Sequence, residues 1–335
     1  MSTAPAIEEP SGGAVASRLA VSAVCNPGSL GIARYVSRLE EALVGVGVDY
    51  RSVRRGRNAG AAHYHLGNSS RALLVERPGR HVPFVVTVHD VVPRTRALGP
   101  LYRARVYPQL LQDARAVVVH SGFAADLLET VARGRPRRLM VIPHPAPRPR
   151  AGTRVDARRT LGWPEDELLV VLPGVIKAAK LVREAVEAVA SAPGWRLALV
   201  GRLADPGAAR AARRRGALIL PEPDDAAYER AVVAADSVLC LRSGSVGETN
   251  GPLLDALGAG RAVLATRSGS IPEVAGEGAS YCDGTAAGIR EGLILLSDDR
   301  VRSDLECRAD RRAGELSWDA SATRHAELFR EVLGG

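Results

Sequence analysis

Residues 238–273 read VLCLRSGSVGETNGPLLDALGAGRAVLATRSGSIPE and predict a strand, a loop, a short helix and a second strand. The runs Val238–Leu241 and Ala262–Ala265 are apolar and of strand length, while the loop Ser243–Gly251 consists mainly of glycine and small polar residues. Pro252 marks the start of the helix, because the missing N–H of proline would have no partner at the first helical position.

The predicted helix begins with residues that suit a phosphate site. Asn250 or Gly251 can cap its first turn, and Gly260 can end it in the left-handed conformation. Such a helix directs free N–H groups and its positive dipole end into the preceding loop, where anions bind. Glu248 stands at the mouth of this loop and Asp255 lies one turn into the helix. Phosphate beside two carboxylates indicates a nucleotide sugar, but a glycine-rich turn with solvated acids fits the spacing equally well.

The segment resembles the donor-binding signature of retaining family-4 glycosyltransferases, which have the GT-B fold. In that family a Glu-Gly-rich loop leads into a helix with a second acidic residue, and Ala-x-x-x-Gly, a strand and Gly-x-x-Glu follow. The matching positions are Gly247 to Gly251, Asp255, Ala256 to Gly260, and Gly269 to Glu273. Many members place the two acids seven residues apart, whereas this chain has six and an aspartate second. It is closer to a subgroup with Gly-Glu-Thr-Ser-Gly.

The resemblance implies an α/β chain of GT-B type, with two Rossmann-like, doubly wound domains facing each other across a cleft. It is specific in the second half and weaker in the first. The expected divisions are a disordered lead-in over residues 1–16, an acceptor domain over 17–147, a proline-rich linker over 148–153, a nucleotide-sugar domain over 154–318 and a helix over 319–335 that crosses back to the first domain.

The composition is that of a globular protein of about two domains. A chain of 335 residues with 46% apolar residues can build a sizeable core, and no apolar run approaches the ~20 residues of a membrane helix. The acidic start MSTAPAIEEPSGGAVAS is neither a signal nor a transit peptide. The four cysteines lack metal-ligand spacing, so we expect reduced thiols in a cytoplasmic protein.

The net charge of +8 comes mainly from arginine, since lysine occurs only at Lys177 and Lys180. Such charge favours anionic partners, but the arginine clusters lack interleaved aromatic residues and no nucleic-acid motif is present. Nucleic acid is therefore not an expected partner. A solvated basic face is the first interpretation of the clusters, and peripheral contact with an anionic membrane or a phosphorylated acceptor is the second.

The first half opens with a strand at Leu19–Val24, a turn-rich loop over 26–31 and a helix at Ile32–Val44. This order is typical of a doubly wound domain, in which ligands meet the carboxyl ends of the strands. The loop is not a complete G-x-G-x-x-G motif. In family 4 a similar loop approaches the donor diphosphate or the acceptor, and the resemblance assigns this place to Gly28 and Gly31.

Polar residues follow the later strands of this half. The apolar strand Phe84–Val88 ends in His89 and an aspartate, and in family 4 a His-Asp pair here hydrogen-bonds the donor sugar. The resemblance therefore makes His89 a candidate catalytic residue. A His-x-x-x-Asn segment often lines the cleft in the family, which makes Asn68 a candidate acceptor contact. His63 and His65 could ligate a metal, but no third ligand lies at a suitable spacing, so none is expected.

The second half restarts with Leu168–Leu172, a continuous apolar run typical of a strand buried on both faces. Gly174 and Lys180 follow. A lysine in an arginine-rich chain suits a diphosphate as a compact point charge, although two exposed lysines at a helix start are the alternative. In family 4 the lysine at this place neutralises the leaving diphosphate. Many members also carry an arginine directly after the glycine, where this chain has Val175.

The resemblance implies sugar transfer from a nucleotide-diphosphate sugar to an acceptor hydroxyl, with retention of configuration and no cofactor. No Asp-x-Asp occurs, so no metal is expected. The acceptor could be a small molecule, a glycan or a lipid-linked compound. The candidate catalytic residues are His89, Lys180 and Glu248, and the candidate donor-binding residues are Gly28, Gly31, Gly174, Glu222, Thr249, Asn250, Gly251 and Asp255.

Two other functions fit the same fold. A nucleotide-sugar epimerase would turn over its nucleotide sugar without an acceptor, whereas a phosphorylase would need a pyridoxal lysine and a longer chain. A non-catalytic partner or sensor would keep the fold without turnover. The valine after Gly174 and the shortened spacing between the acids give this last alternative some support.

Overall fold

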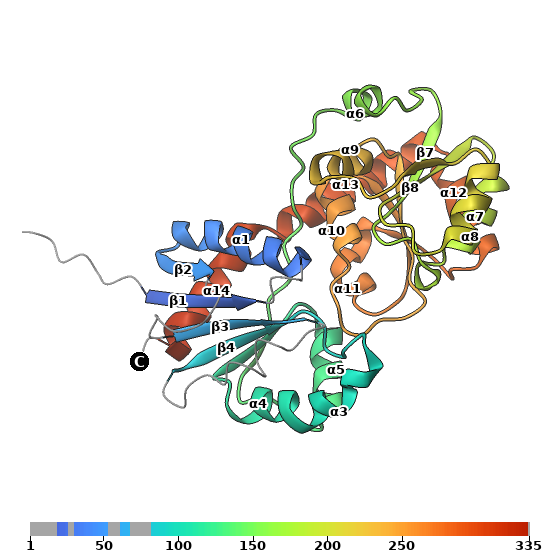
Figure 1. Cartoon of the computed structure of the whole chain (residues 1–335). Coiled ribbons are helices and arrows are strands. Elements are labelled where there is room, and N and C mark those ends of the chain that lie inside the picture. The colour runs from blue at the N-terminus through green and yellow to red at the C-terminus, as the bar shows by residue number, and fades with distance from the viewer. Residues whose placement is uncertain (1–18, 26–29, 53–60, 68–81, 334–335) are drawn as a thin grey trace, which may run out of the picture.

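The computed structural model describes residues 19–25, 30–52, 61–67 and 82–333. Two six-stranded sheets, one in each half of the chain, are flanked by helices (Figure 1). The first sheet contains β1 (Leu19–Cys25), β2 (Val48–Ser52), β3 (Ala61–Leu66), β4 (Phe84–Val88), β5 (Ala116–Val119) and β6 (Leu139–Val141). The second contains β7 (Leu168–Pro173), β8 (Trp195–Val200), β9 (Leu218–Leu220), β10 (Ser237–Cys240), β11 (Ala262–Thr266) and β12 (Ser280–Cys282).

The helices connect these strands. The first half contains α1 (Leu30–Gly45), α3 (Gly99–Leu101), α4 (Tyr107–Gln112) and α5 (Gly122–Ala132), with a 3-10 turn at Arg96–Leu98 and a π turn at Tyr102–Val106. The second contains α6 (Arg154–Leu161), α7 (Val182–Ala190), α8 (Pro206–Arg214), α9 (Asp225–Val233), α10 (Gly251–Gly258), α11 (Ile271–Ala275), α12 (Ala286–Leu296), α13 (Asp299–Glu315) and α14 (Trp318–Leu333), with 3-10 turns at Ala178–Lys180 and Gly276–Gly278.

Every strand pair is parallel, and both sheets are doubly wound. The strand orders are β2-β1-β3-β4-β5-β6 and β12-β11-β10-β7-β8-β9. The strand order reverses between β1 and β3 in the first sheet and between β10 and β7 in the second. Ligands of such sheets bind outside the carboxyl ends of the strands at this reversal point. The loops after β7 and β10 therefore occupy the expected ligand-binding position of the second domain.

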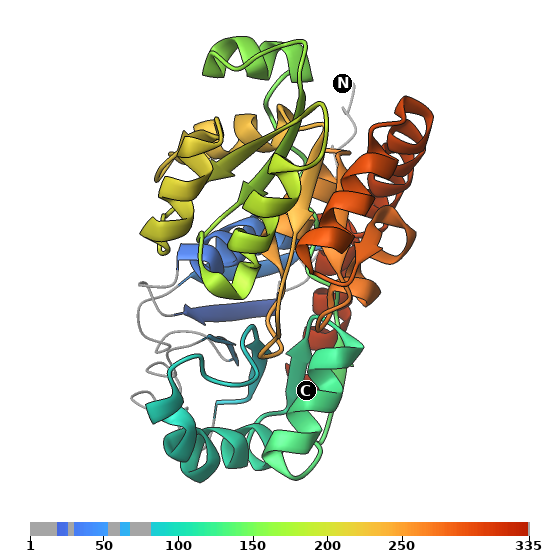
Figure 2. The ribbon, with the colours of Figure 1, turned by 90° about the vertical axis from the view of Figure 1, so that its right-hand side faces the viewer.

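The core of the first domain has two layers of helices. The helix α1 contributes Tyr35, Leu39 and Leu43 to the cluster on one face of the sheet, and α14 contributes Ala326 and Phe329 to the same cluster. The π turn, α4 and α5 cover the other face. The final helix therefore completes the core of the first domain, although the whole second domain separates it from that domain in sequence (Figures 1 and 2).

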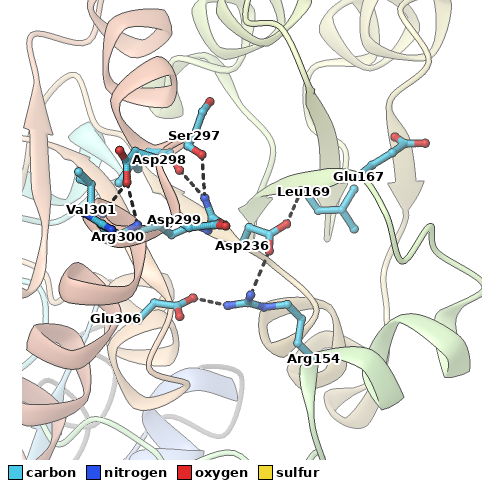
Figure 3. A network of polar contacts seen from close by, with 12 residues as sticks. Arg154, Glu167, Leu169, Asp236, Ser297, Asp298, Asp299, Arg300, Val301 and Glu306 are labelled. Atoms are coloured by element: carbon cyan, nitrogen blue, oxygen red, sulfur yellow. Dashed lines mark hydrogen bonds and ion pairs between the residues drawn. The ribbon is translucent and has the colours of Figure 1, made fainter.

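The second domain is layered in the same way, with α9, α10 and α13 on one face and α7, α8 and α12 on the other. A buried ionic network ties its amino-terminal strand ends together (Figure 3). Asp236 accepts hydrogen bonds from the Leu169 N–H at 2.7 Å and the Arg158 Nη2 at 2.5 Å, and its second oxygen lies 3.1 Å from the Arg154 Nη1. Arg154 also pairs with Glu306 on α13. The network lies at the opposite strand ends from the ligand-binding loops, so it is structural.

Residues 142–153 link the domains without regular structure, up to the capping box at Thr153 that begins α6. None of the helices in the described ranges is long and apolar enough to cross a membrane. The four cysteines are free thiols, of which Cys240 is buried and Cys307 exposed.

Candidate active site

A cavity of about 340 Å³ lies between the two domains. The first domain lines it with α1 and with the loops that follow β4 and β6, and the second domain lines it with the loop after β10 and the first turn of α10. The described candidates that line this cavity are Gly31, His89, Glu248, Thr249, Gly251 and Asp255. The structure therefore brings together, at one place, candidates that are more than 200 positions apart in the sequence.

The start of α10 has the predicted capping geometry. The side chain of Asn250 accepts a hydrogen bond from the Leu253 N–H, and Pro252 lies in the first turn. Gly260 follows the helix with φ of 60°, which is the left-handed conformation predicted for the end of this helix. Because Gly251 lines the cavity, the amino-terminal, positive end of the helix dipole opens into the space between the domains.

The loop before α10 holds Glu248 in a fixed position. One carboxylate oxygen of Glu248 accepts from the Ser245 hydroxyl at 2.8 Å and from the Val246 N–H at 2.7 Å. The other oxygen lies 3.8 Å from the Arg242 Nη1. A carboxylate held from behind in this way presents its remaining lone pairs to the cavity, where they can accept hydrogen bonds from hydroxyl groups.

The same loop lies directly against the first domain. Gly247 has φ of 83°, and a Cβ at this position would lie 2.6 Å from the Val91 side chain. The next residue of the first domain, Val92, donates its N–H to the Val246 carbonyl at 3.0 Å. Glycine at position 247 is thus required both by the backbone conformation and by the contact between the domains.

Asp255, on α10, is half-buried and hydrogen-bonded to a tyrosine of α9. The Tyr228 hydroxyl donates to the Asp255 carboxylate at 3.0 Å. Burial raises the pKa of Asp255 to about 6, although the Tyr228 hydrogen bond and the charges of Arg38 and Arg34 on α1 act in the opposite direction. The carboxylate therefore lies where the two domains meet, with two arginines of the first domain facing it across the cleft.

Lys180 and Gly174 occupy the neighbouring loop, after β7. The Lys180 ammonium group donates to the Pro173 carbonyl, and its side chain is buried and does not line the cavity. Burial, together with the nearby charges of Arg242 and Lys177, lowers the pKa of Lys180 to about 7. Gly174 has φ of 93°, and a Cβ there would lie 2.6 Å from the ammonium nitrogen.

The loops after β7 and β10 in the second domain are joined by a backbone hydrogen bond. The Ser243 N–H, in the loop after β10, donates to the Ala179 carbonyl, in the loop after β7, at 3.1 Å. Lys180 is therefore adjacent to the glycine-rich loop, beneath its surface. A role for Lys180 toward a diphosphate stays a prediction. The ammonium group has three N–H donors, of which the Pro173 carbonyl takes one, so binding a ligand requires the buried group to become accessible from the cavity.

His89 follows β4 as predicted, but its ring nitrogens face other histidines. His89 Nε2 lies 3.1 Å from His65 Nδ1, and His89 Nδ1 lies 3.3 Å from His120 Nε2. The next residue, Asp90, accepts hydrogen bonds at one carboxylate oxygen from two nitrogens of Arg94, Nε at 3.2 Å and Nη2 at 2.8 Å. A sugar hydroxyl could bond to a ring nitrogen of His89 only by sharing or displacing one of these histidine contacts.

The remaining candidates lie apart from this group. Glu222 is exposed after the edge strand β9, where it has the left-handed φ of 45° that is uncommon for a residue with a side chain. It does not line the cavity, and its role in donor binding stays a prediction. Gly28 and Asn68 lie outside the described residues, as does the lead-in over residues 1–16.

The sequence did not point to several residues that line the cavity. Arg34 and Arg38 lie one helical turn apart on α1, and Arg34 reaches across the cleft to pair with Asp225. His144 and Trp318 come from the two chain crossings between the domains. The two arginines follow the first glycine loop at a spacing of one helical turn, and this pattern could have indicated that they line the cavity. No sequence pattern indicated Trp318, because its position depends on how α14 returns to the first domain.

Two comparisons with known sequences bear on this site. A model described as Glycosyltransferase Family 4 matches residues 51–147. The chain is also 26% identical over 300 residues to the D-inositol 3-phosphate glycosyltransferase of Mycobacterium marinum. That match covers 81% of this chain and 63% of the relative, so the chain spans less than two thirds of the relative's length.

Solved structures share the architecture at low sequence identity. Sucrose-phosphate synthase of Thermosynechococcus elongatus superposes with a TM-score of 0.74 at 17% identity, over 95% of this chain and 100% of that one. Anabaena HepE in complex with UDP and glucose superposes with a TM-score of 0.67 at 14% identity, over 93% and 99%. Two parallel, doubly wound domains that face each other across a cleft constitute the GT-B fold, and the fold predicted from the sequence is confirmed.

Proposed function

We propose that this protein is a glycosyltransferase that moves a sugar, with retention of configuration and without a metal, from a nucleotide-diphosphate sugar to an acceptor hydroxyl. The observation that carries the proposal is the opening of the α10 amino terminus into the inter-domain cavity beside Glu248. An anion site and a fixed carboxylate then lie within one cavity, which suits a ligand that has both phosphate and hydroxyl groups. The matches to the family-4 model and to the mycobacterial relative support the same activity.

In this proposal each domain has a distinct task. The free N–H groups of the first α10 turn bind the diphosphate and stabilise the negative charge that grows on it as the sugar leaves. Glu248 accepts hydrogen bonds from sugar hydroxyls and orients the ring. Asp255, which Tyr228 orients, accepts from the ribose hydroxyls. The acceptor enters from the first domain and attacks on the face from which the phosphate departs, and the leaving phosphate takes its proton.

The names of the relatives suggest which compounds to test first. A structural neighbour binds UDP and glucose, so UDP-glucose is a suitable donor to begin with. The mycobacterial relative is named for D-inositol 3-phosphate, and Arg38 at the cavity supplies positive charge for a phosphorylated acceptor. Arg34 and Arg94 also line the cavity, each paired with an aspartate that an acceptor phosphate would replace. An acceptor phosphate is therefore the first chemistry to examine in this cleft.

The test is a panel of UDP-glucose, UDP-N-acetylglucosamine and GDP-mannose, each with and without D-inositol 3-phosphate, with released nucleoside diphosphate as the readout. We expect one donor to raise the melting temperature and to be turned over, because a ligand that binds only the folded state stabilises it. Glu248→Ala should then lower kcat by roughly 100-fold while the Kd for the nucleoside diphosphate stays within about twofold.

The control and the rival functions are separated in the same experiment. Glu291→Ala changes an exposed carboxylate on α12, outside the cavity lining, and should leave turnover unchanged. Equal losses of turnover and nucleotide affinity in Glu248→Ala would assign Glu248 to structure. Interconversion of the sugar without release of nucleoside diphosphate would identify an epimerase, and binding without turnover of any donor would identify a non-catalytic protein.

A further inference from the structure

Six histidines of the described part of the chain lie together in the first domain. They are His63 and His65 on β3, His89 after β4, His120 after β5, His144 after β6 and His325 on α14. Adjacent parallel strands thus each deliver an imidazole to the same edge of the sheet. The Tyr35 ring of α1 packs against four of these imidazoles, with centroid distances between 4.8 and 5.7 Å.

Four of these histidines are joined in one continuous hydrogen-bonded chain. Thr87 Oγ1 lies 2.7 Å from His63 Nε2, and His63 Nδ1 lies 2.7 Å from the Tyr50 hydroxyl. The Tyr50 hydroxyl lies 2.8 Å from His65 Nε2. The chain continues from His65 to His89 and from His89 to His120, across the 3.1 and 3.3 Å contacts given above. It ends where His120 Nδ1 lies 2.9 Å from the Ile142 carbonyl oxygen.

The last contact sets the direction of all the others. A carbonyl oxygen can only accept, so His120 Nδ1 carries the proton and the Nε2 of neutral His120 accepts. His89 must then donate through Nδ1 and accept through Nε2, and His65 must do the same. The Tyr50 hydroxyl donates to His65 and accepts from His63, which in turn accepts from Thr87. Every donor in the chain meets one acceptor, and all the imidazoles are neutral Nδ1–H tautomers.

We propose that His65 and His120 are positioning residues that hold His89 as a neutral imidazole of fixed tautomer beside the reacting sugar. The proposal rests on the glycosyltransferase function proposed above. Glycosyl transfer passes through an oxocarbenium-like state with positive charge on the sugar. A protonated His89 lining the cavity would oppose this charge, whereas a neutral ring whose nitrogens are both engaged does not.

The chain does not serve as a route for protons between the cavity and solvent. At one end Thr87 is fully buried, and at the other end the Ile142 carbonyl has no proton to pass on. Burial and the neighbouring imidazoles of His120 and His65 also lower the pKa of His89 well below its ordinary value, so the neutral ring persists. The chain therefore fixes a charge state and an orientation.

Nitrogen-15 NMR of the histidine-labelled protein, without substrate, tests the tautomer directly. In the wild type we expect a protonated Nδ1 and an unprotonated Nε2 for His89 at pH 7.5. An imidazolium or an Nε2–H tautomer at His89 would overturn the proposal, whether or not the protein transfers sugars. This readout depends on the chain alone, so it separates failure of this inference from failure of the proposed function.

The His120→Leu variant tests the link to catalysis. It removes the carbonyl-anchored acceptor, so His89 should switch to the Nε2–H tautomer and the chain should reverse toward Thr87. With the donor turned over in the panel above, we expect kcat to fall by at least roughly tenfold and KM to stay within about twofold. His120→Gln supplies an amide that can accept from His89 and donate to Ile142, and it should restore most of both signals.

His325→Leu is the matched control. His325 is equally buried near the His63 ring, but its Nδ1 bonds to the Ser321 carbonyl outside the chain. The His325→Leu variant should leave the His89 tautomer and kcat unchanged. Similar losses of kcat in His325→Leu and His120→Leu, or an unchanged His89 tautomer in His120→Leu, would show that these histidines only support the fold and would overturn the proposal.

Discussion

The carboxylate of Glu273, in the second domain, lies 2.7 Å from the backbone nitrogen of Gly122, in the first domain. Its second oxygen accepts from the Phe123 N–H at 3.1 Å, so the carboxylate occupies the amino-terminal end of α5. A negative charge at this end of a helix is favourable because the first N–H groups are unpaired there and the dipole is positive. Glu273, on α11, thus joins the second domain directly to the first.

Replacing Glu273 with glutamine should loosen this closed arrangement. The amide retains one acceptor but loses the charge, at a cost of about 1 kcal/mol, and transfer should slow by roughly fivefold. Small-angle X-ray scattering should show a larger radius of gyration. Glu277→Gln removes an exposed carboxylate four residues away and should change neither quantity. If both variants scatter like the wild type, the contact does not control closure.

Binding of UDP at pH 8 should be accompanied by proton uptake at Lys180. The pKa of this buried lysine is about 7, so most of it is neutral at pH 8, and a diphosphate nearby would raise that pKa and charge it. Calorimetry in two buffers of different ionisation enthalpy should report close to one proton taken up per UDP. Lys180→Met should abolish the uptake, while Lys177→Met should retain most of it. Identical uptake in the wild type and Lys180→Met would place Lys180 away from the diphosphate.

The first domain should lose stability steeply below pH 6.5. Burial lowers the pKa of His120 and of His325 to about 4 and that of His144 to about 3, and it lowers the pKa values of His63, His65 and His89 well below the ordinary value. The unfolded chain then binds more protons, so stability is complete above pH 6.5 and is lost as the pH falls toward the folded-state pKa values.

Each such histidine contributes about 1.4 kcal/mol per pH unit in that window, so six together give an upper limit on the order of 8 kcal/mol per unit. That is comparable to the total stability of a typical domain. Urea unfolding followed at pH 7.5 and 5.5 should show a large drop in the midpoint, and His325→Gln should reduce that drop by about one sixth, because one of the six histidines is removed. A midpoint that does not change between the two pH values would contradict the neutral, buried cluster.

Asp236→Asn should be strongly destabilising. The substitution leaves the Arg158 guanidinium, whose side chain is 4% exposed, without its charged partner, and breaking a buried pair from one side costs roughly 3 kcal/mol or more. Urea denaturation is the measurement. Asp304→Asn breaks an exposed pair with Arg308 on α13 and should cost less than about 1 kcal/mol. Similar losses in the two variants would mean that the Asp236 network is not a stabilising element.

The sequence predicted most of the strand framework because parallel strands buried on both faces leave continuous apolar runs. The strand Phe84–Val88 has the predicted bounds, and the strands Leu19–Cys25, Leu168–Pro173 and Ala262–Thr266 each extend one residue beyond theirs. The loop Ser243–Gly251 and the helix α10 could also be predicted, since the Asn250 cap, Pro252 and Gly260 each have a local conformational cause. Local chemistry of this kind can be read without knowing the rest of the fold.

Other features depend on contacts between distant segments and were missed. The strand β3 contains His63 and His65, and these polar residues conceal its apolar pattern although all six of its residues are buried. Their burial is explained only by Tyr50, Thr87 and the other histidines, which supply their hydrogen bonds.

The position of α14 has a consequence for biosynthesis. The sheet made from residues 19–141 keeps one apolar face uncovered along the α14 site until residues 318–333 have left the ribosome. During that interval the second domain can already fold, whereas the first domain still lacks the helix that covers its sheet. A chaperone that covers the exposed apolar face would therefore raise the yield of folded first domain. Premature termination within α14 would lower it.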